Sequence, residues 1–347
     1  MRSTSLGVCF ALLASLLAVT GANAIENPLA KLWTGEAVFQ ESPETIGNPS
    51  DNMHFISMFW DCDFVDATRT PHLKAYFIGG PGDFSTNLSR SNDGVNFSEA
   101  VTVLPIGKPG EWDDRIAAFS SVWKAAGTYY LVYEGAGKDS KWPGDIGLAT
   151  STDGINFEKH GTILTHKPGT FEKTNIGTPS LYKKGKKWYL FYHGYDGIDV
   201  QLGIATGTDL SDLTRVSSKP IIPVSDSGWD CGTVGKRSRI IKEGTYYYMA
   251  YEGSTNPLND SNDWNTAEWN SGLARSTDLI HWEKMPFNPV LAGTSGGFGY
   301  DGPELVTISD EVFLYFRKCS DNSGQQTFRS DSQTFRAKLI LQEAATK

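Results

Sequence analysis

A seven-residue motif recurs along the chain and limits what the chain can fold into. Two copies are nearly identical, at 91–97 (SNDGVNF) and 151–157 (STDGINF), and two looser copies lie at 207–213 and 276–282. Asp-Gly or Asp-Leu followed by an aromatic residue or leucine is typical of a tight turn that leads into a strand. The motif aspartates lie about 60, 56 and 69 residues apart. A turn-plus-strand unit at this interval predicts an array of four-stranded sheets, a β-propeller.

The repeats can be followed beyond their turns. Aromatic-rich strand patterns that follow a glycine turn or a short loop occur five times, at 75–80, 129–135, 188–194, 246–253 and 313–317. We therefore expect an all-β fold, a five-bladed β-propeller with four antiparallel strands per blade. The last repeat lacks a clear Asp turn, so we expect residues 32–40 to supply an outer strand to it and close the ring. No stretch has helical periodicity, and no helix is expected.

The first residues have the pattern of a secretory signal. Arg2 precedes a short apolar run at 6–19, and Ala22-Asn23-Ala24 is a small-x-small cleavage site. We expect a signal peptide at 1–24, export to the extracellular or periplasmic space, and one catalytic propeller domain at 25–347. The formal net charge of −9 argues against a nucleic-acid or anionic-membrane partner.

Three cysteines follow the predicted signal peptide: Cys62, Cys231 and Cys319. Three thiols allow at most one disulfide, so this is not a disulfide scaffold. A Cys62–Cys319 bond would join the first and last blades at the channel mouth. The alternative of three free thiols remains open.

Chemistry is expected at one mouth of the central channel. The innermost strand of each blade starts at the face where its antiparallel partner ends. Charged and aromatic residues gather at these strand starts and ends, and they differ from blade to blade: Asp61, Asp63, Trp112, Asp114, Arg115, Asp230, Arg237, Asp301 and Glu304 at the starts, and Glu134, His193, Glu252 and Arg317 at the ends.

Such a ring suits a sugar. Aromatic faces pack on sugar rings, and two carboxyl groups on opposite sides of a glycosidic bond are what hydrolysis requires. We expect Asp61, Asp114 and Asp301 to be catalytic and the other ten residues of the ring to bind substrate. The competing interpretation is that individual members form ion pairs between blade ends.

Here the sequence resembles a known family. Trp60-Asp61, Trp112-Asp113-Asp114, Asp301-Gly302-Pro303 and the Tyr-Tyr-Leu strands resemble the five-bladed propeller glycoside hydrolases of the arabinanase, family 43 and family 117 groups, with the family 130 mannoside phosphorylases as cousins. The resemblance implies a base at Asp61, with Asp63 as a rival. The family 43 acid is a glutamate in a Glu-Gly-Pro segment of the fourth blade, where this chain has Gly235-Lys236-Arg237. The acidic residue before Gly-Pro is Asp301, in the fifth.

The expected function is a secreted glycoside hydrolase that cleaves a plant, algal or microbial poly- or oligosaccharide by carboxylate acid/base catalysis. One alternative is a phosphate-dependent glycosidase, because Tyr192-His193-Gly194 resembles the phosphate-binding segment of the phosphorylase cousins. The other is a non-catalytic sugar-binding propeller, but a lectin would repeat its site in every blade. We expect a carbohydrate substrate, a monomer and no cofactor, with a structural cation in the channel as an open alternative.

Overall fold

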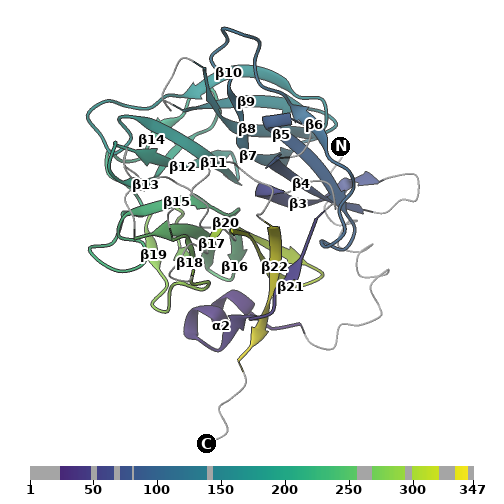
Figure 1. Cartoon of the computed structure of the whole chain (residues 1–347), viewed down its shortest axis with the longest axis vertical. Helices are drawn as coiled ribbons and strands as arrows, with labels where there is room; N and C mark the ends of the chain where they lie inside the picture. Colours follow the sequence, from purple (N-terminus) through teal and green to yellow (C-terminus); the bar gives the residue numbers. More distant parts are fainter. Residues whose placement is uncertain are drawn as a thin grey trace, which may run out of the picture.

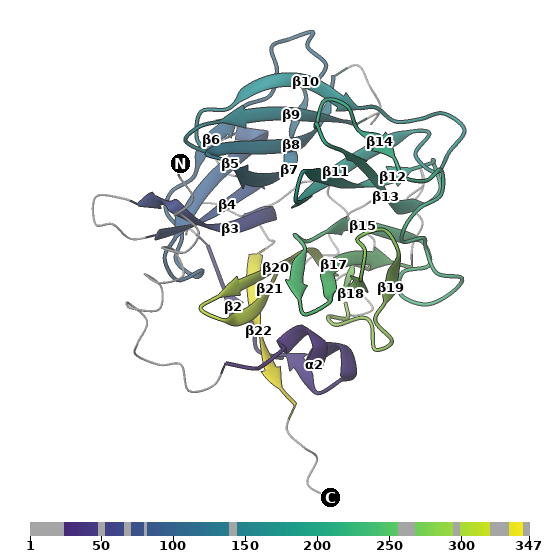
Figure 2. The ribbon, with the colours of Figure 1, turned by 180° about the vertical axis from the view of Figure 1, so that it is seen from behind.

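The computed structural model describes residues 24–47, 53–65, 71–79, 82–138, 144–255, 268–293, 299–319 and 333–342. Strands dominate these residues, and they surround a common centre in sequence order (Figures 1 and 2). The expectation of an all-β fold is confirmed in the coarser form that the described residues are nearly all-β. Within these residues no helix is long and apolar enough to cross a membrane.

Antiparallel runs of strands form the repeating unit. The second unit consists of β7 (Ile116–Ala125), β8 (Thr128–Ala136), β9 (Asp145–Ser151) and β10 (Glu158–Leu164), each paired with the next. The first unit consists of β3 (His54–Val65), β4 (Pro71–Gly79), β5 (Gly82–Ser91) and β6 (Val101–Leu104). The third consists of β11 (Asn175–Lys184), β12 (Lys187–Tyr195), β13 (Val200–Gly207) and β14 (Thr214–Arg215).

The last two units vary this plan. The fourth contains β15 (Thr233–Arg237), β16 (Ile241–Glu243), β17 (Tyr246–Ser254), β18 (Asn270–Ser276) and β19 (Trp282–Lys284), with β15 and β16 both paired to β17. The fifth contains β20 (Gly299–Ile308), β21 (Glu311–Cys319) and β22 (Gln333–Leu341), to which β1 (Ala37–Phe39) and β2 (Glu44–Thr45) add from the N-terminal side.

Hydrogen bonding groups these strands into three sheets rather than five. The first and second units join through one parallel pairing, Ser85 with Ala117, and the third and fourth through another, Val200 with Thr233. Within each unit the pairing is antiparallel, as expected.

The N-terminal segment behaves partly as expected. Ala37 pairs with Leu341, so residues within 32–40 do add a strand to the last unit. The expectation of no helix is wrong, because α2 (Pro28–Thr34) precedes that strand. Only two turns long, α2 is too short for periodicity to reveal. Its first amide groups, of Leu29 and Ala30, donate to the Glu243 carboxylate at 3.2 and 2.8 Å.

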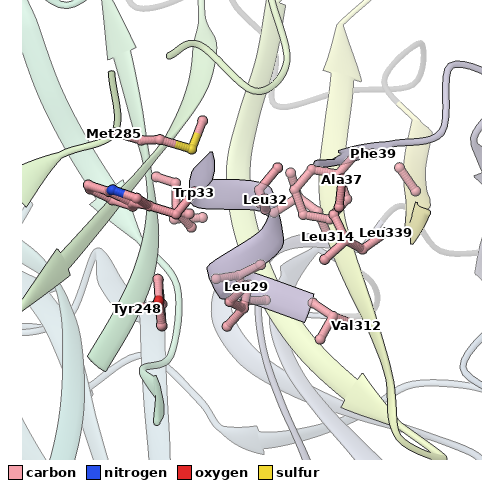
Figure 3. Packing of buried hydrophobic residues seen from close by; sticks show 14 of the residues in the cluster. Leu29, Leu32, Trp33, Ala37, Phe39, Tyr248, Met285, Val312, Leu314 and Leu339 are labelled. Carbon is pink, nitrogen blue, oxygen red and sulfur yellow. The ribbon is translucent and has the colours of Figure 1, made fainter. Parts of the chain in front are cut away.

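One hydrophobic cluster fixes α2 to the fourth and fifth units (Figure 3). Leu29, Leu32 and Trp33 are buried on one face of the helix, and Trp33 meets Tyr248 edge to face at 6.4 Å. Burying a large apolar side chain contributes about 1.5–3 kcal/mol. The helix therefore owes its stability to this packing and not to its length.

The Asp turns are structural. In the copy at 151–157, Ser151 Oγ accepts the Asp153 and Gly154 amides at 3.1 and 2.9 Å, and Asp153 Oδ1 accepts the Ile155 and Asn156 amides at 2.8 Å. The same bonds recur at 91–97 and 276–282. The turn also links units, because Tyr76 of the first unit donates to Gly154 O at 2.8 Å.

This turn predicts a difference between two glycine substitutions. Gly154 and Gly161 both have positive φ, of 72° and 82°. An added Cβ at Gly154 would lie 2.8 Å from both Tyr129 and Tyr76 side chains, whereas at Gly161 it meets nothing within 4 Å. Gly161→Ala should cost about 1 kcal/mol of backbone strain, and Gly154→Ala about 2–4 kcal/mol, measured by urea denaturation. Equal losses would contradict the packing role of the turn.

Candidate active site

The inner strand of every unit has a bulge at the same place. Pairing with the second strand shifts by one residue between Ala118 and Ser121 in β7, and between Gly177 and Ser180 in β11. Equivalent shifts occur at His54/Ser57, Val234/Arg237 and Asp301/Glu304. A bulge leaves extra backbone groups unpaired and re-aims side chains, and bulges are frequent beside functional sites.

Four predicted site residues lie opposite these bulges, one on each second strand from the second unit to the fifth: Glu134, His193, Glu252 and Arg317. Three of them pair with the residue just before the bulge, and Glu252 lies one position away, because its neighbour Gly253 pairs with Val234. The corresponding residue of the first unit is Ile78.

Hydrogen bonds between neighbouring inner strands close a ring. Val122 N donates to Ser57 Oγ at 3.4 Å, and Leu181 N donates to Ser121 Oγ at 3.1 Å. Ser180 Oγ donates to the Ser238 carbonyl at 3.3 Å. Glu304 completes the circuit, accepting the Met58 and Arg239 amides at 3.1 Å. All five units therefore contribute to one centre, which places the bulges around it.

Two cationic side chains connect several units around this centre. Lys236 Nζ donates to the carbonyls of Ile56, Gly302 and Pro303 at 3.2–3.4 Å and lies 3.9 Å from Glu304. Burial lowers the pKa of Lys236 and raises that of Glu304. Arg239 Nη1 reaches across to the Val122 carbonyl at 2.6 Å. Glu304, predicted to bind substrate, has its carboxylate committed to this ring closure.

Glu134 reaches from the second unit to the bulge of the third. Its Oε2 accepts the Thr178 amide at 2.9 Å, and Asn175 donates to the same carboxyl group. Burial raises the pKa of Glu134 to about 7. A Cβ at Gly177 would lie 2.0 Å from Oε2, so the carboxyl group occupies the space that glycine leaves.

Glu252 repeats this arrangement in the fourth unit. Its Oε1 accepts the Lys236 amide and its Oε2 the Gly302 amide, both at 2.8 Å. Burial, and next the negative charge of Asp301, raise the pKa of Glu252 to about 7. Asp301 itself is held by Arg317, whose Nε donates to Oδ1 at 2.7 Å and whose Nη2 donates to Oδ2.

His193 and Arg237 lie between these two carboxyl groups along the ring. His193 bonds Thr178 Oγ1 through Nδ1 and Asn175 Oδ1 through Nε2, both at 2.8 Å. Burial, and next the charge of Arg237, lower the pKa of His193 to about 3, so the imidazole is neutral. Arg237 Nη2 donates to the Thr178 carbonyl and, at 3.0 Å, to Thr178 Oγ1.

Thr178 contacts Glu134, His193 and Arg237, and the sequence analysis missed it. Its backbone has a φ of 40°, and Pro179 follows it inside a strand. A proline within a strand marks an edge or a bulge. The same signal, Gly302-Pro303, marks the bulge of the fifth unit.

The prediction that Asp61 begins the first inner strand is wrong. β3 begins at His54, and Asp61 lies in the part of the strand away from the bulge. Its carboxylate contacts Lys74 Nζ at 2.9 Å and Lys124 Nζ at 2.7 Å and accepts a bond from Tyr129. Burial acts to raise the pKa of Asp61, but these bonds lower it overall. The error arose because Trp60-Asp61 looks like Trp112-Asp113, although it lies in the wrong part of its unit.

The aspartates that follow Trp112 and Trp229 connect strands within the second and fourth units. Asp113 accepts from Tyr133 at 3.0 Å and from Lys159 at 2.6 Å. Asp230 likewise accepts from Tyr251 at 3.1 Å and pairs with Lys284 at 2.7 Å. Trp112 stacks near Tyr133, and a Cβ at Gly135 or Gly147 would collide with it. These contacts favour a structural role for Trp112 and Asp230.

Three predicted site residues remain to be placed: Asp114, Arg115 and Asp63. Asp114 lies beside the start of β7 and accepts the Gly110 and Lys138 amides at 2.8 Å, which lowers its pKa. Arg115 directly precedes β7 and is half-buried. The side chain of Asp63 lies outside the described part of the chain.

Three expectations remain without a structural test: the Cys62–Cys319 disulfide, the signal peptide and a structural cation in the channel. Cys231 is a free thiol, but the side chains of Cys62 and Cys319 lie outside the described part, as do residues 1–23 of the predicted signal peptide at 1–24. Within the described residues, no group of three His, Cys, Asp or Glu side chains could hold a metal ion.

The raised carboxyl pKa values predict a pH-dependent stability. A folded glutamic acid with a pKa near 7, against 4.5 as its ordinary value, binds its proton more tightly than the unfolded chain. The stability it contributes is present below about pH 4.5 and is lost as pH rises through 7. Urea denaturation should therefore give a free energy of unfolding that falls from pH 5 to 8. Glu134→Gln should reduce that fall by up to about 1.4 kcal/mol per pH unit, while the exposed control Glu158→Gln should not.

Comparison with known proteins supports the fold. No protein-family model matches the chain. A structure titled a glycoside hydrolase superposes with a TM-score of 0.67 at 14% identity, covering 94% of this chain and 98% of that one. A thermostable family-43 glycoside hydrolase gives 0.61 at 16% identity, covering 86% and 94%. A family 117 glycoside hydrolase from Zobellia galactanivorans gives 0.58 at 13% identity, covering 87% and 90%.

One curated protein is similar over a shorter stretch. Sucrose-6-phosphate hydrolase from Escherichia coli is 30% identical over an alignment of 135 residues, and the match covers 35% of this chain. The match spans only 27% of that enzyme. The structural likeness covers nearly the whole chain, and it confirms the fold that the resemblance implied: this chain has the propeller fold of the family 43, family 117 and arabinanase glycoside hydrolases.

Proposed function

We propose that this protein is a glycoside hydrolase whose catalytic carboxyl groups are Glu134 and Glu252. The observation that carries the proposal is their equivalence: each is buried, lies opposite the bulge of its unit, and has a pKa of about 7. Perturbed carboxyl groups that converge on one centre are typical of an acid–base site. The glycoside hydrolase structures that share this fold support the reaction class.

Glu252 is the better general acid. Two effects raise its pKa, burial and the neighbouring Asp301 carboxylate, and both favour the protonated form that must give a proton to the leaving oxygen. Glu134 then acts as base or nucleophile from the other side of His193. Asp301, tied to Arg317, serves to hold the pKa of Glu252 high. This assignment replaces Asp61 and Asp114, whose contacts are with lysines, a tyrosine and loop amides.

We also propose that the five units are the five blades of one propeller domain. The ring of hydrogen bonds from Ser57 to Glu304 passes once through each unit, which supports this count although the strands form three sheets. The signal-like pattern of residues 1–24 supports export, and therefore action on a poly- or oligosaccharide outside the cell.

Phosphorolysis is the second candidate function. The main argument for it is that the segment around His193 resembles a phosphate-binding segment, and the contacts of His193 weaken that argument. Both ring nitrogens of His193 are already bonded to Thr178 and Asn175, and the imidazole carries no charge. His193 is therefore suited to positioning Thr178 rather than to binding phosphate.

A substrate panel tests the proposal. Arabinosides, galactosides and mannosides should be assayed with and without inorganic phosphate, and products followed by chromatography. We expect a free sugar to be released without phosphate. Release of sugar phosphate only, or sugar binding without any turnover, would instead support the phosphorylase or the lectin interpretation.

A further inference from the structure

We infer that Arg237 binds a negatively charged group of the sugar, so that the protein acts on an acidic saccharide. This inference rests on the proposed function, because it assigns the sugar to the same site. It names a substrate class that the fold alone does not give.

The guanidinium of Arg237 is buried and only partly bonded. The residue is 2% exposed, and Nη2 donates to the carbonyl and Oγ1 of Thr178. Nε and Nη1 have no hydrogen-bond partner, and Arg237 takes part in no ion pair among the described residues. An arginine has five N–H donors, so most of this group is left unsatisfied. A buried charge without a partner costs several kcal/mol.

The neighbouring groups neutralise this charge only in part, through the negative charge of Glu252. His193 is neutral, as shown above. Both oxygens of Glu252 already accept backbone amides, and with a pKa of about 7 this carboxyl group is only partly ionised at neutral pH. Burial lowers the pKa of Arg237 to about 9, which still leaves the guanidinium protonated. The site therefore has a positive charge that a ligand can balance.

Comparison between the units shows that the propeller itself does not require this arginine. When Glu252 is aligned with Glu134 and His193, the residues equivalent to Arg237 are Ile56, Ser120, Pro179 and Pro303. Three of these are apolar. Ser120 is the other polar one, and its buried Oγ also lacks a partner. The two polar positions belong to the second and fourth units, on either side of the third unit that contains Thr178, and both offer unused hydrogen-bonding groups.

A carboxylate fits this site better than a free phosphate. A single guanidinium balances one negative charge, which is what a uronate carries, whereas phosphate near neutral pH carries up to two. Arginine also matches the planar geometry of a carboxylate.

Equilibrium binding tests the inference. Calorimetric titrations should compare D-glucuronate, D-galacturonate and D-mannuronate with the neutral sugars glucose, galactose and mannose, and with inorganic phosphate. At least one uronate should bind tenfold or more tightly than its neutral counterpart, and Arg237→Met should remove that preference. Arg275→Met, which removes an arginine paired with Glu283 on the outer strands, should keep it. Arg237→Gln provides a second variant if the methionine variant does not fold.

Three results would overturn the inference: no uronate preferred over its neutral sugar, a preference that survives in both Arg237 variants, or Arg237-dependent binding of phosphate alone. The last would assign the arginine to free phosphate. Binding needs no turnover, so a protein that binds uronates through Arg237 yet hydrolyses nothing would contradict the hydrolase proposal and leave this inference intact.

Discussion

Glu134→Gln and Glu252→Gln should each lower kcat/KM by about 10²–10⁴-fold, the range that positioned proton transfer contributes. Glutamine keeps the size of the side chain. Its one carbonyl oxygen can still accept the Thr178 amide in Glu134→Gln, and either the Lys236 or the Gly302 amide in Glu252→Gln. The change therefore removes the titrating proton while most of the contacts survive. Initial rates on a substrate that the panel identifies, measured from pH 5 to 9, would give the result.

The control for this experiment is Glu158→Gln, an exposed glutamate on β10. It should keep wild-type rates, and circular dichroism should show all three variants folded. A loss below tenfold in either site variant, with the fold intact, would remove that glutamate from the acid–base pair. The wild-type profile of kcat/KM against pH should be bell-shaped around pH 7, because one group must be protonated and the other ionised.

Lys236→Met should lower the free energy of unfolding by about 3–5 kcal/mol, which is typical when one partner of a buried charged group is removed. The lysine donates to carbonyls of the first and fifth units at 3.2–3.4 Å, and methionine would leave these acceptors and Glu304 without it. An unsatisfied buried acceptor costs about 1–3 kcal/mol. Urea denaturation at pH 7 measures the loss.

The matched control is Lys186→Met in the exposed turn between β11 and β12, which should change stability by no more than about 0.5 kcal/mol. A loss below about 1 kcal/mol for Lys236→Met would show that the ring does not depend on this central cation. The effect on stability can be separated from the proposed catalytic role of Glu252. Lys236 supports the fold through its side-chain ammonium group, whereas it contacts Glu252 through its backbone amide, which Lys236→Met keeps.

Several site residues could be predicted because the repeat itself encodes their position. Glu134, His193 and Glu252 each follow a tyrosine and precede a glycine at the end of an aromatic strand. Antiparallel pairing then brings each of them to within one residue of the position that pairs just before the bulge of its unit. The acid–base assignment could not be predicted, because it depends on which carboxyl groups the neighbouring units bury.

Asp61 shows where sequence reasoning failed. The local pattern Trp-Asp is the same as in the second unit, but the strand that contains it starts seven residues earlier, at His54. Position along a strand depends on pairing with β4, which no local signal reports. Asp61 therefore meets Lys74 and Lys124 instead of the bulge.

The sequence by itself determined the repeat, the β class and the addition of an N-terminal strand to the last unit, because turns and strand patterns are local properties of the chain. Only the tertiary structure decided which groups are charged and which lack partners. Thr178, Arg237 and Glu134 come from three different units, and their bonds and burial exist only once those units surround one centre. Desolvation and hydrogen bonding act over a few ångströms in space, whatever the separation along the chain.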